Sequence, residues 1–125
     1  MVEQKPNQYF FNDLDWQIDE IEKRGGNIIL AIGRRLPRWP ECHDPEWIKN
    51  LNKKQAQEQI LKMLAKIVNR YKNRKAIKAW QVENEPFLFI FGKCPAPDPA
   101  FLKKEIELVK SLDNRPVVLT ESGEL

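Results

Sequence analysis

The run from Ile28 to Ile32 constrains the fold of this chain more than any other segment, because it is apolar at five consecutive positions. A strand without a polar face needs cover on both sides, which is typical of a parallel strand between layers of helices. Gly25 and Gly26 stand shortly before it, and glycine accepts the left-handed conformation that ends a helix. We therefore expect a helix from about Asn12 to Arg24, followed by a strand that is buried on both faces.

Two more pairs of a helix and a strand follow along the chain. Apolar residues between Lys53 and Tyr71 recur at the spacing of an amphipathic helix, and a candidate strand, Ile77 to Asn84, comes next. Asp98 and Pro99 are suited to open the next helix, and Pro116 to Glu121 is a third candidate strand. This alternation predicts an α/β fold with a parallel sheet and right-handed crossovers. Barrels and open doubly wound sheets both begin in this way, and the periodicity alone leaves both open.

Two segments between these elements are expected to be loops. Residues 34–47 contain three prolines, which exclude regular structure from most of the segment. Residues 87–91 are all apolar, but they follow one strand directly and precede the start of a helix. We expect a loop or a short helical turn there.

The balance of residue types is that of one globular domain spanning residues 1–125. Hydrophobic residues make up 42% and charged residues 31%, with a formal net charge of +3. Lys and Arg lie beside Asp and Glu along the predicted helices, which favours a solvated surface over binding to nucleic acid. No apolar run reaches the length of a membrane span, and no signal peptide is visible, so we expect no membrane segment in this chain and leave its cellular location open.

Carboxylates, aromatic rings and hydrogen-bonding groups gather in the segments that follow the predicted strands. In a barrel, all of these segments lie at the carboxyl-terminal face of the sheet, where active sites are found. Tryptophan offers a flat apolar face to a sugar ring, while Asn, His and Arg bind sugar hydroxyls, so the set suits a sugar-binding cleft. The residues are Arg34, Arg35, Arg38, Trp39, Glu41 and His43 after the first strand, Asn84, Glu85 and Phe87 after the second, and Thr120, Glu121, Ser122 and Glu124 at the end of the third.

The segment AWQVENEP, residues 79–86, resembles the fourth strand of the clan-A retaining glycoside hydrolases, a large group of (β/α)8 barrels that includes cellulases, mannanases and β-galactosidases. The resemblance implies that Glu85 is the general acid/base and that Asn84 holds the sugar 2-hydroxyl. The segment PRWPECHDPEW resembles the loop after the third strand of that clan, and PVVLTESGEL resembles the fifth strand. The resemblance therefore predicts an incomplete (β/α)8 (TIM) barrel, with three parallel strands alternating with three helices.

Trp39, His43 and Arg34 are the candidate substrate-binding residues beside this motif. Trp39 is either a platform for a sugar ring or a plug under the long loop, and His43 has either a substrate role or a structural one. For Glu85, the alternative is a strand-end turn in which Asn, Glu and Pro serve geometry only. Glu83 is expected either to support the site from behind or to point toward a layer of helices.

The chain departs from the clan in the second carboxylate that retaining hydrolysis requires. The clan places its nucleophile on the seventh strand, and this chain ends after the segment that resembles the fifth. A complete barrel has about 250 residues, so the chain is about half of one. We expect the isolated chain to be inactive, and the full form to cleave β-linked glycosides without a cofactor. A non-catalytic carbohydrate-binding or interaction remnant and an unrelated small α/β domain are the alternatives.

A sheet cut from a barrel has two unpaired edges, and parallel edges are normally covered. The edges of this sheet are therefore expected to bind a complementing chain or to drive self-association.

Cys42 and Cys94 lie in the loops that follow the first and second predicted strands. Consecutive strands joined by a right-handed crossover are normally neighbours, so their loops emerge side by side, and we expect a disulfide between the two cysteines. The alternative is two independent thiols in a reducing compartment, whereas a disulfide implies that the full-length ancestor was exported. Residues 41–44 also include metal-ligand types, but adjacent residues rarely converge on one ion, and we expect no metal site.

Overall fold

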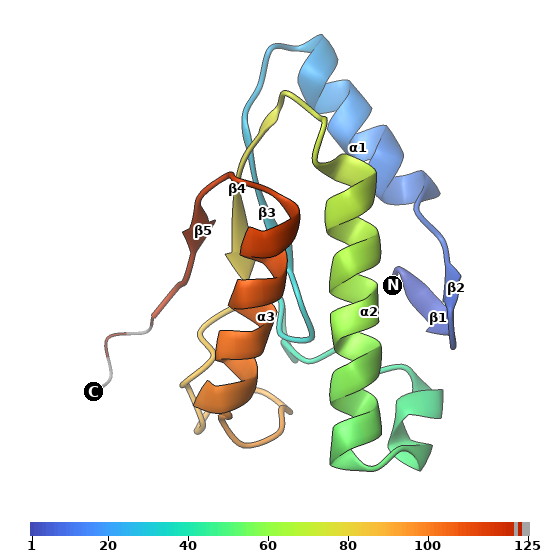
Figure 1. The fold of residues 1–125 in the computed structure, drawn as a ribbon, viewed down its shortest axis with the longest axis vertical. Coiled ribbons are helices and arrows are strands. Elements are labelled where there is room, and N and C mark those ends of the chain that lie inside the picture. The colour runs from blue at the N-terminus through green and yellow to red at the C-terminus, as the bar shows by residue number, and fades with distance from the viewer. Residues whose placement is uncertain (122, 124–125) are drawn as a thin grey trace.

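The computed structural model describes residues 1–121 and 123, and its centre is a three-stranded parallel sheet. The strands are β3 (Ile28–Ile32), β4 (Ile77–Val82) and β5 (Val117–Val118), which are neighbours in the order of the sequence. They alternate with the helices α1 (Asn12–Lys23), α2 (Lys53–Tyr71) and α3 (Pro99–Leu112), as Figure 1 shows. The predicted order of elements and the parallel pairing are confirmed.

Three short elements were not expected from the sequence. Strands β1 (Glu3–Lys5) and β2 (Gln8–Tyr9) pair as an antiparallel hairpin, and a 3-10 helix, η1, covers Glu46–Asn50. The hairpin turns at Asn7, which has a φ of 59° and donates its backbone N–H to Glu3 Oε1 at 2.7 Å. Strands of two or three residues are too short to show an alternation of apolar and polar residues.

The ends of two strands differ from the predicted bounds. Strand β4 stops at Val82 rather than Asn84, because Glu83 and Glu85 have positive φ angles of 61° and 45° that break the extended chain. Strand β5 is limited to Val117 and Val118, where it pairs with the middle of β4, and the expected extension to Glu121 forms no ladder.

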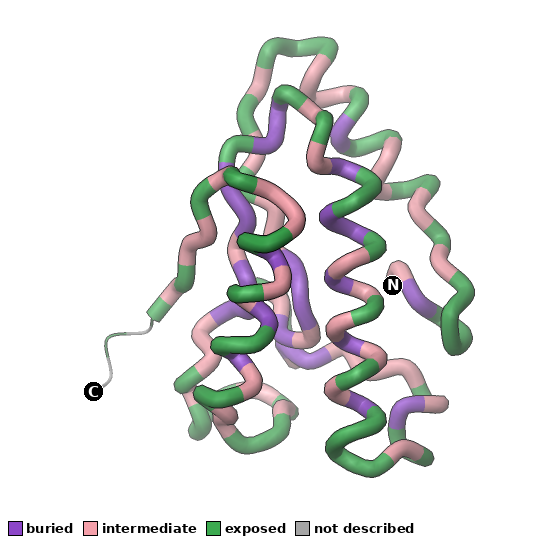
Figure 2. The backbone as a smooth tube through the Cα atoms, viewed as in Figure 1, coloured by how far each residue is buried: buried purple, intermediate pink, exposed green. Residues whose placement is uncertain are grey.

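The hydrophobic core lies between the sheet and the helices. Helices α2 and α3 cover one face of the sheet (Figure 1), and buried positions follow the inner side of α2 and the strands (Figure 2). Trp80 on β4 is fully buried there, and its indole N–H donates to Asp113 Oδ2 at 2.8 Å. The buried members of this core are Ile18, Ile32, Ile60, Leu64, Ile67, Val68, Tyr71, Ile77, Trp80, Val82, Leu102 and Val109.

The expectation that β3 is buried on both faces is wrong. Ile29 is 62% exposed, whereas Ile32 is 2% exposed and lies in the core. Side chains alternate along a strand, and Ile29 pairs with Ala79 and Ala31 with Gln81, so these four residues share the face opposite the helices. In a closed barrel that face is the filled interior, but three strands leave it open in this chain.

None of the described helices is both long enough and apolar enough to cross a membrane.

Replacing an isoleucine of β3 by alanine should affect stability differently on the two faces of the strand. Ile32→Ala removes a buried side chain and should lower the free energy of unfolding by about 2–5 kcal/mol. Ile29→Ala should change it by less than about 1 kcal/mol, because only strand propensity is lost on an exposed face. Urea denaturation of both variants measures the difference. An equal loss in both would contradict an open face and would show that Ile29 is covered in solution.

Candidate functional site

The segments that follow β3, β4 and β5 meet at one end of the sheet. Residue Asn84, directly after β4, lies at the centre of this end, and its side chain is buried. Asn84 Oδ1 accepts hydrogen bonds from Gln81 Nε2 at 3.0 Å and from Thr120 Oγ1 at 3.1 Å. Asn84 Nδ2 donates to Glu41 Oε2 at 3.4 Å, and its backbone N–H donates to the Arg35 carbonyl at 2.9 Å. One amide therefore links the loop after β3, the end of β4 and the residues after β5.

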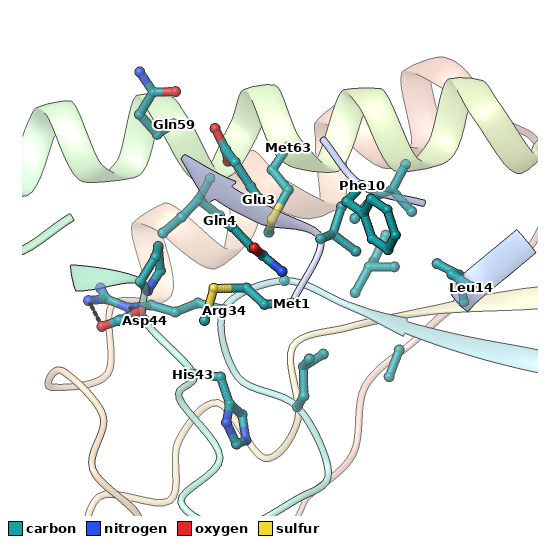
Figure 3. A pocket seen from close by; sticks show the side chains of 18 of the residues that line it. Met1, Glu3, Gln4, Phe10, Leu14, Arg34, His43, Asp44, Gln59 and Met63 are labelled. Carbon is teal, nitrogen blue, oxygen red and sulfur yellow. Dashed lines mark hydrogen bonds and ion pairs between the residues drawn. The ribbon is translucent and has the colours of Figure 1, made fainter. Parts of the chain in front are cut away.

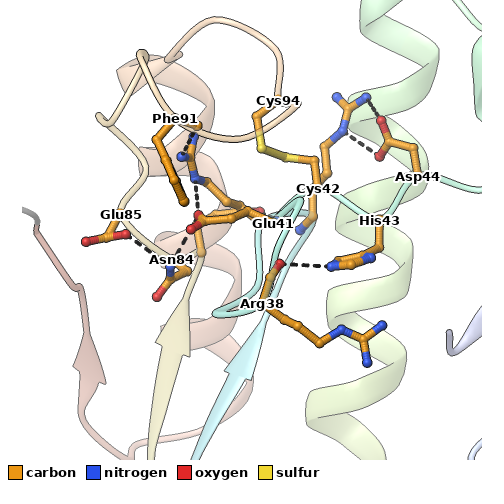
Figure 4. Close-up of a disulfide and its surroundings, with 12 residues drawn as sticks. Arg38, Glu41, Cys42, His43, Asp44, Asn84, Glu85, Phe91 and Cys94 are labelled. Carbon is orange, nitrogen blue, oxygen red and sulfur yellow. Dashed lines mark hydrogen bonds and ion pairs between the residues drawn. A yellow bond between two sulfur atoms is a disulfide. The ribbon is translucent and has the colours of Figure 1, made fainter.

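Glu85 is held beside Asn84 by its backbone. Its N–H donates to Thr120 Oγ1 at 3.0 Å, while Asn84 Nδ2 lies 3.5 Å from Glu85 Oε2. The side chain is half-buried, and within residues 1–121 and 123 no cation forms an ion pair with it. Figure 4 shows the carboxylate pointing away from the disulfide loops. A carboxyl in this position can exchange a proton with a ligand that enters at the end of the sheet.

A buried ion pair braces the loops around Asn84. Arg35 Nε donates to Glu41 Oε2 at 3.0 Å, and both side chains are buried. Arg35 Nη2 also donates to the carbonyl of Phe91 at 3.0 Å, which ties the loop after β3 to the loop after β4. Glu41 has a φ of 71°, a conformation that a non-glycine residue keeps only when its surroundings determine it. The sequence assigned neither residue this role, since burial of a charged residue in a loop leaves no periodic signal.

The same two loops are joined covalently. Cys42 and Cys94 form a disulfide with a Cα–Cα distance of 5.2 Å and a sequence separation of 52 residues. The argument from neighbouring loops placed the two cysteines side by side, and the structure has this arrangement (Figure 4). By loop-closure entropy, a bridge across this separation stabilises the folded chain by about 4 kcal/mol.

Trp39 lies at the surface of this region. Its side chain is 60% exposed, and one edge contacts the Phe91 ring with centroids 4.9 Å apart. The indole is thus held from one side and open on the rest. An indole that is 60% exposed is not a plug under the loop.

Arg34 and His43 lie elsewhere. Arg34 forms a two-point ion pair with Asp44, and Nε lies 2.7 Å from Asp44 Oδ1. His43 Nε2 lies 3.1 Å from the carbonyl oxygen of Arg38. Figure 4 shows His43 and Asp44 on the opposite side of the disulfide from Glu85, so the structure does not bring either candidate to the acid.

Both residues line a separate cavity of about 480 Å³ beside α2 (Figure 3). The N-terminal hairpin, α1, the end of β3 and α2 form its walls. Arg34 turns away from Glu85 because its carboxylate partner, Asp44, lies on the α2 side. The residues labelled there include Met1, Phe10, Arg34, His43, Asp44 and Met63.

Glu83 points toward the helices, one of the two orientations expected for it. It is buried, and its carboxylate accepts the backbone N–H groups of Arg34 at 2.7 Å and Arg35 at 2.6 Å. Gly33 makes room for this carboxylate, because a Cβ on Gly33 would lie 2.3 Å from Glu83 Oε1. The bonds fix the end of β3 against the end of β4.

The third group of predicted site residues lies at the end of the chain. Glu121 is exposed and has further interactions, while Glu124 and Ser122 lie outside the described residues. Among residues 1–121 and 123, no three His, Cys, Asp or Glu side chains are grouped so that they could hold a metal ion.

No protein family and no curated protein matches the sequence, whereas solved structures match the fold. The GH10 xylanase of Thermobacillus composti superposes with a TM-score of 0.69 at 18% identity, over 96% of this chain and 34% of the xylanase. The chain has the fold of part of a (β/α)8 barrel.

Two further xylanases agree with this barrel segment. Xylanase 10B of Thermotoga maritima gives a TM-score of 0.67 at 17% identity, over 96% of this chain and 37% of that chain. Xylanase 10B of Thermotoga petrophila RKU-1, solved with xylobiose, gives a TM-score of 0.63 at 16% identity, over 96% of this chain and 36% of that chain. The barrel segment spans about a third of the length of these enzymes, and the likeness concerns the fold alone.

Because the Glu83 carboxylate occupies the space beside Gly33, we expect a side chain at position 33 to destabilise the fold. Gly33→Ala forces the carboxylate off the two amides and also strains a φ of 123°, whereas Gly25→Ala strains a φ of 69° in open space. We expect Gly25→Ala to lower the free energy of unfolding by about 1–2 kcal/mol, and Gly33→Ala by about 2 kcal/mol more. Thermal or urea unfolding of the two variants compares them. Equal losses would mean that Glu83 does not occupy this position.

Proposed function

We propose that this barrel segment belongs to a retaining glycoside hydrolase for β-linked sugars, in which Glu85 is the general acid/base and Asn84 binds the sugar 2-hydroxyl. The observation that carries the proposal is the placement of Glu85 and Asn84 together at the carboxyl end of β4, in a sheet with the fold of a xylanase barrel. In barrels of this kind, catalytic residues come from the ends of the strands. The xylanase neighbours favour a xylan-like β-linked polysaccharide as the substrate class.

The surroundings of Glu85 suit both halves of the reaction. In the first step, protonated Glu85 gives its proton to the glycosidic oxygen while a second carboxylate attacks the anomeric carbon and the leaving group departs. In the second step, ionised Glu85 takes a proton from water, which attacks the anomeric carbon and releases that carboxylate. The half-buried side chain of Glu85 forms no ion pair with a cation of the described residues, so its carboxyl group is left open toward a ligand.

Asn84 is set up to bind a hydroxyl rather than to react. Its Oδ1 is fully used by Gln81 and Thr120, which fixes the orientation of the amide. The contacts of Nδ2 with Glu41 and Glu85 are long, at 3.4 and 3.5 Å, so a sugar hydroxyl that accepts a shorter bond can replace one of them.

The second carboxylate is not supplied by the neighbours of Asn84. Glu41 is the other acid that reaches this amide, but it is buried and paired with Arg35, so it has no open face toward a sugar. The barrel segment covers about a third of the xylanases it resembles, and the remaining strands of such a barrel carry the partner acid in this proposal. A non-catalytic sugar-binding remnant is the second candidate, favoured by the same shortage of a second acid.

Sugar binding by this segment is tested with Trp39, for which the chain provides a matched control. Trp39 is 60% exposed beside Phe91, and Trp16 is 65% exposed on α1. In an NMR titration with β-1,4-linked xylo-oligosaccharides, Trp39→Ala should raise the dissociation constant about tenfold, because it removes the apolar platform. Trp16→Ala should leave it unchanged. Equal effects, or shift changes that avoid Asn84 and Glu85, would argue against a sugar site here.

The role of Glu85 is tested by the leaving group of the substrate. We expect no turnover of aryl β-glycosides by the isolated chain, because one carboxylate cannot serve both steps. In a polypeptide that contains the complete barrel, Glu85→Ala should lower the rate about 10²–10⁴-fold for a poor leaving group. The first step should survive with a dinitrophenyl leaving group, which departs without a proton. Equal losses for both leaving groups would assign Glu85 another role, and no loss would support a binding remnant.

A further inference from the structure

We propose that Glu83 and Glu105 share one proton, and that Glu105 is thereby a positioning residue that ties α3 to the strand ends carrying Asn84 and Glu85. The inference rests on contacts within the described residues and stands whether or not the chain is part of a glycosidase.

The hydrogen bonds show which of the two acids is ionised. Both oxygens of Glu83 accept a backbone N–H, from Arg34 at 2.7 Å and from Arg35 at 2.6 Å, as a carboxylate does. Glu105 is 1% exposed and lines the same cavity as Glu83, and hydrogen bonding between the two carboxyl groups lowers the pKa of Glu83 against the effect of burial. Glu105 Oε1 is buried and receives no hydrogen bond from the described part of the chain. A hydroxyl oxygen that donates has this pattern, so the proton resides on Glu105.

The electrostatic surroundings support the same assignment. Burial raises the pKa of Glu105, and the adjacent charge of Glu83 raises it further. Burial also raises the pKa of Glu83, but hydrogen bonds from Glu105, Arg34 and Arg35 act in the opposite direction. Two anions in direct contact inside the fold would repel each other, whereas a carboxylic acid bonded to a carboxylate attracts.

The other charged groups around the pair are largely committed to partners of their own. Arg34 lowers the pKa of both acids and Asp98 raises that of Glu105, yet Arg34 is paired with Asp44 and Asp98 with Lys53 at 2.7 Å. The pair lines a cavity of about 500 Å³, whose other charged residues are Arg34, Arg35, Asp44, Lys49, Lys53 and Asp98.

The pair connects the helix layer with the candidate site through short steps. Glu105 on α3 holds Glu83, Glu83 holds the amides of Arg34 and Arg35, and the Arg35 carbonyl accepts the N–H of Asn84 at 2.9 Å. Glu83 keeps its positive φ of 61° within this set of bonds. Loss of the shared proton therefore loosens the turn that presents Asn84 and Glu85.

The test is the pH dependence of stability in the 125-residue chain and two variants. In the folded chain Glu105 keeps its proton above the ordinary Glu pKa of 4.5, while in the unfolded chain it loses it. The stabilising contribution is therefore complete below about pH 4.5 and is lost progressively as the pH rises toward the raised pKa. Glu105→Gln keeps a donor toward Glu83 and carries no titrating proton. Glu107→Gln, on the exposed side of the same helix, is the matched control.

As the pH rises from about 5.5 to 8.5, the wild type should lose stability relative to Glu105→Gln. The ratio of the folding equilibrium constant of Glu105→Gln to that of the wild type should rise by up to tenfold per pH unit. Glu107→Gln should stay parallel to the wild type. Parallel pH profiles for all three chains would overturn the proposal. If Glu105→Gln does not fold, ¹³C NMR of the wild-type carboxyl carbons decides: one Glu should keep the shift of the protonated acid above pH 8, and titration of every Glu near its ordinary value would overturn the proposal.

Amide hydrogen exchange tests the positioning role separately. The Arg34 and Arg35 amides should stay protected in Glu105→Gln and exchange at least about tenfold faster in Glu105→Leu, which has no donor for Glu83. Equal protection in the two variants would show that Glu105 does not act through Glu83.

Discussion

The buried amide of Asn84 is the point at which the segments after β3, β4 and β5 meet. Parallel strands end at the same edge of a sheet, but nothing in the strands themselves joins the loops that follow them. The side chain of Asn84 does so, by accepting from Gln81 and Thr120 and by donating to Glu41. Glu41 and Glu85, the two acids of the candidate site, both contact this amide.

Two sets of contacts stabilise the buried polar groups around Asn84. The hydrogen bond from Arg35 to the Phe91 carbonyl and the Cys42–Cys94 bridge both join the loop after β3 to the loop after β4, on the side of Asn84 away from Glu85, and the Arg35–Glu41 ion pair fixes the first of these loops. On the helix side, Glu83 closes the ends of β3 and β4 through two backbone amides. A partly satisfied network inside a protein is unfavourable, so these contacts are expected to depend on one another. Glu85, next to Asn84, is left half-buried outside these contacts.

The sequence predicted the long elements and their order, because amphipathic spacing in α2 and unbroken hydrophobicity in β3 are properties of many residues at once. It also placed Glu85 and Asn84 at a strand end, since Pro86 follows them directly. The hairpin β1–β2 and the short η1 helix carry too few residues to produce a periodic signal. The exposure of Ile29 was not predictable from its apolar run, because it depends on whether the sheet closes over this face, which the run does not encode.

The directions of charged side chains in the loops were also beyond the sequence. Arg34 and Arg35 are adjacent, yet one pairs with Asp44 on the α2 side and the other with Glu41 beside Asn84. His43, like Asp44, lines the separate cavity and does not lie beside Glu85. The direction of each side chain depends on which partner lies near it in the folded chain. At Glu41 and Glu83 it also depends on a positive φ angle. Neither can be read from composition or spacing.

The central claim, that the Asn84 amide organises this end of the sheet, is tested most directly by the unfolding free energy of Asn84→Ala. Asn73, exposed in the turn after α2, provides the control substitution Asn73→Ala. Removing the Asn84 side chain takes away its hydrogen bonds with Gln81, Thr120 and Glu41 and leaves a gap among these polar groups, and we expect a loss of about 2–4 kcal/mol. Asn73→Ala should change the stability by less than about 0.5 kcal/mol. Equal and small changes in the two variants would contradict the claim.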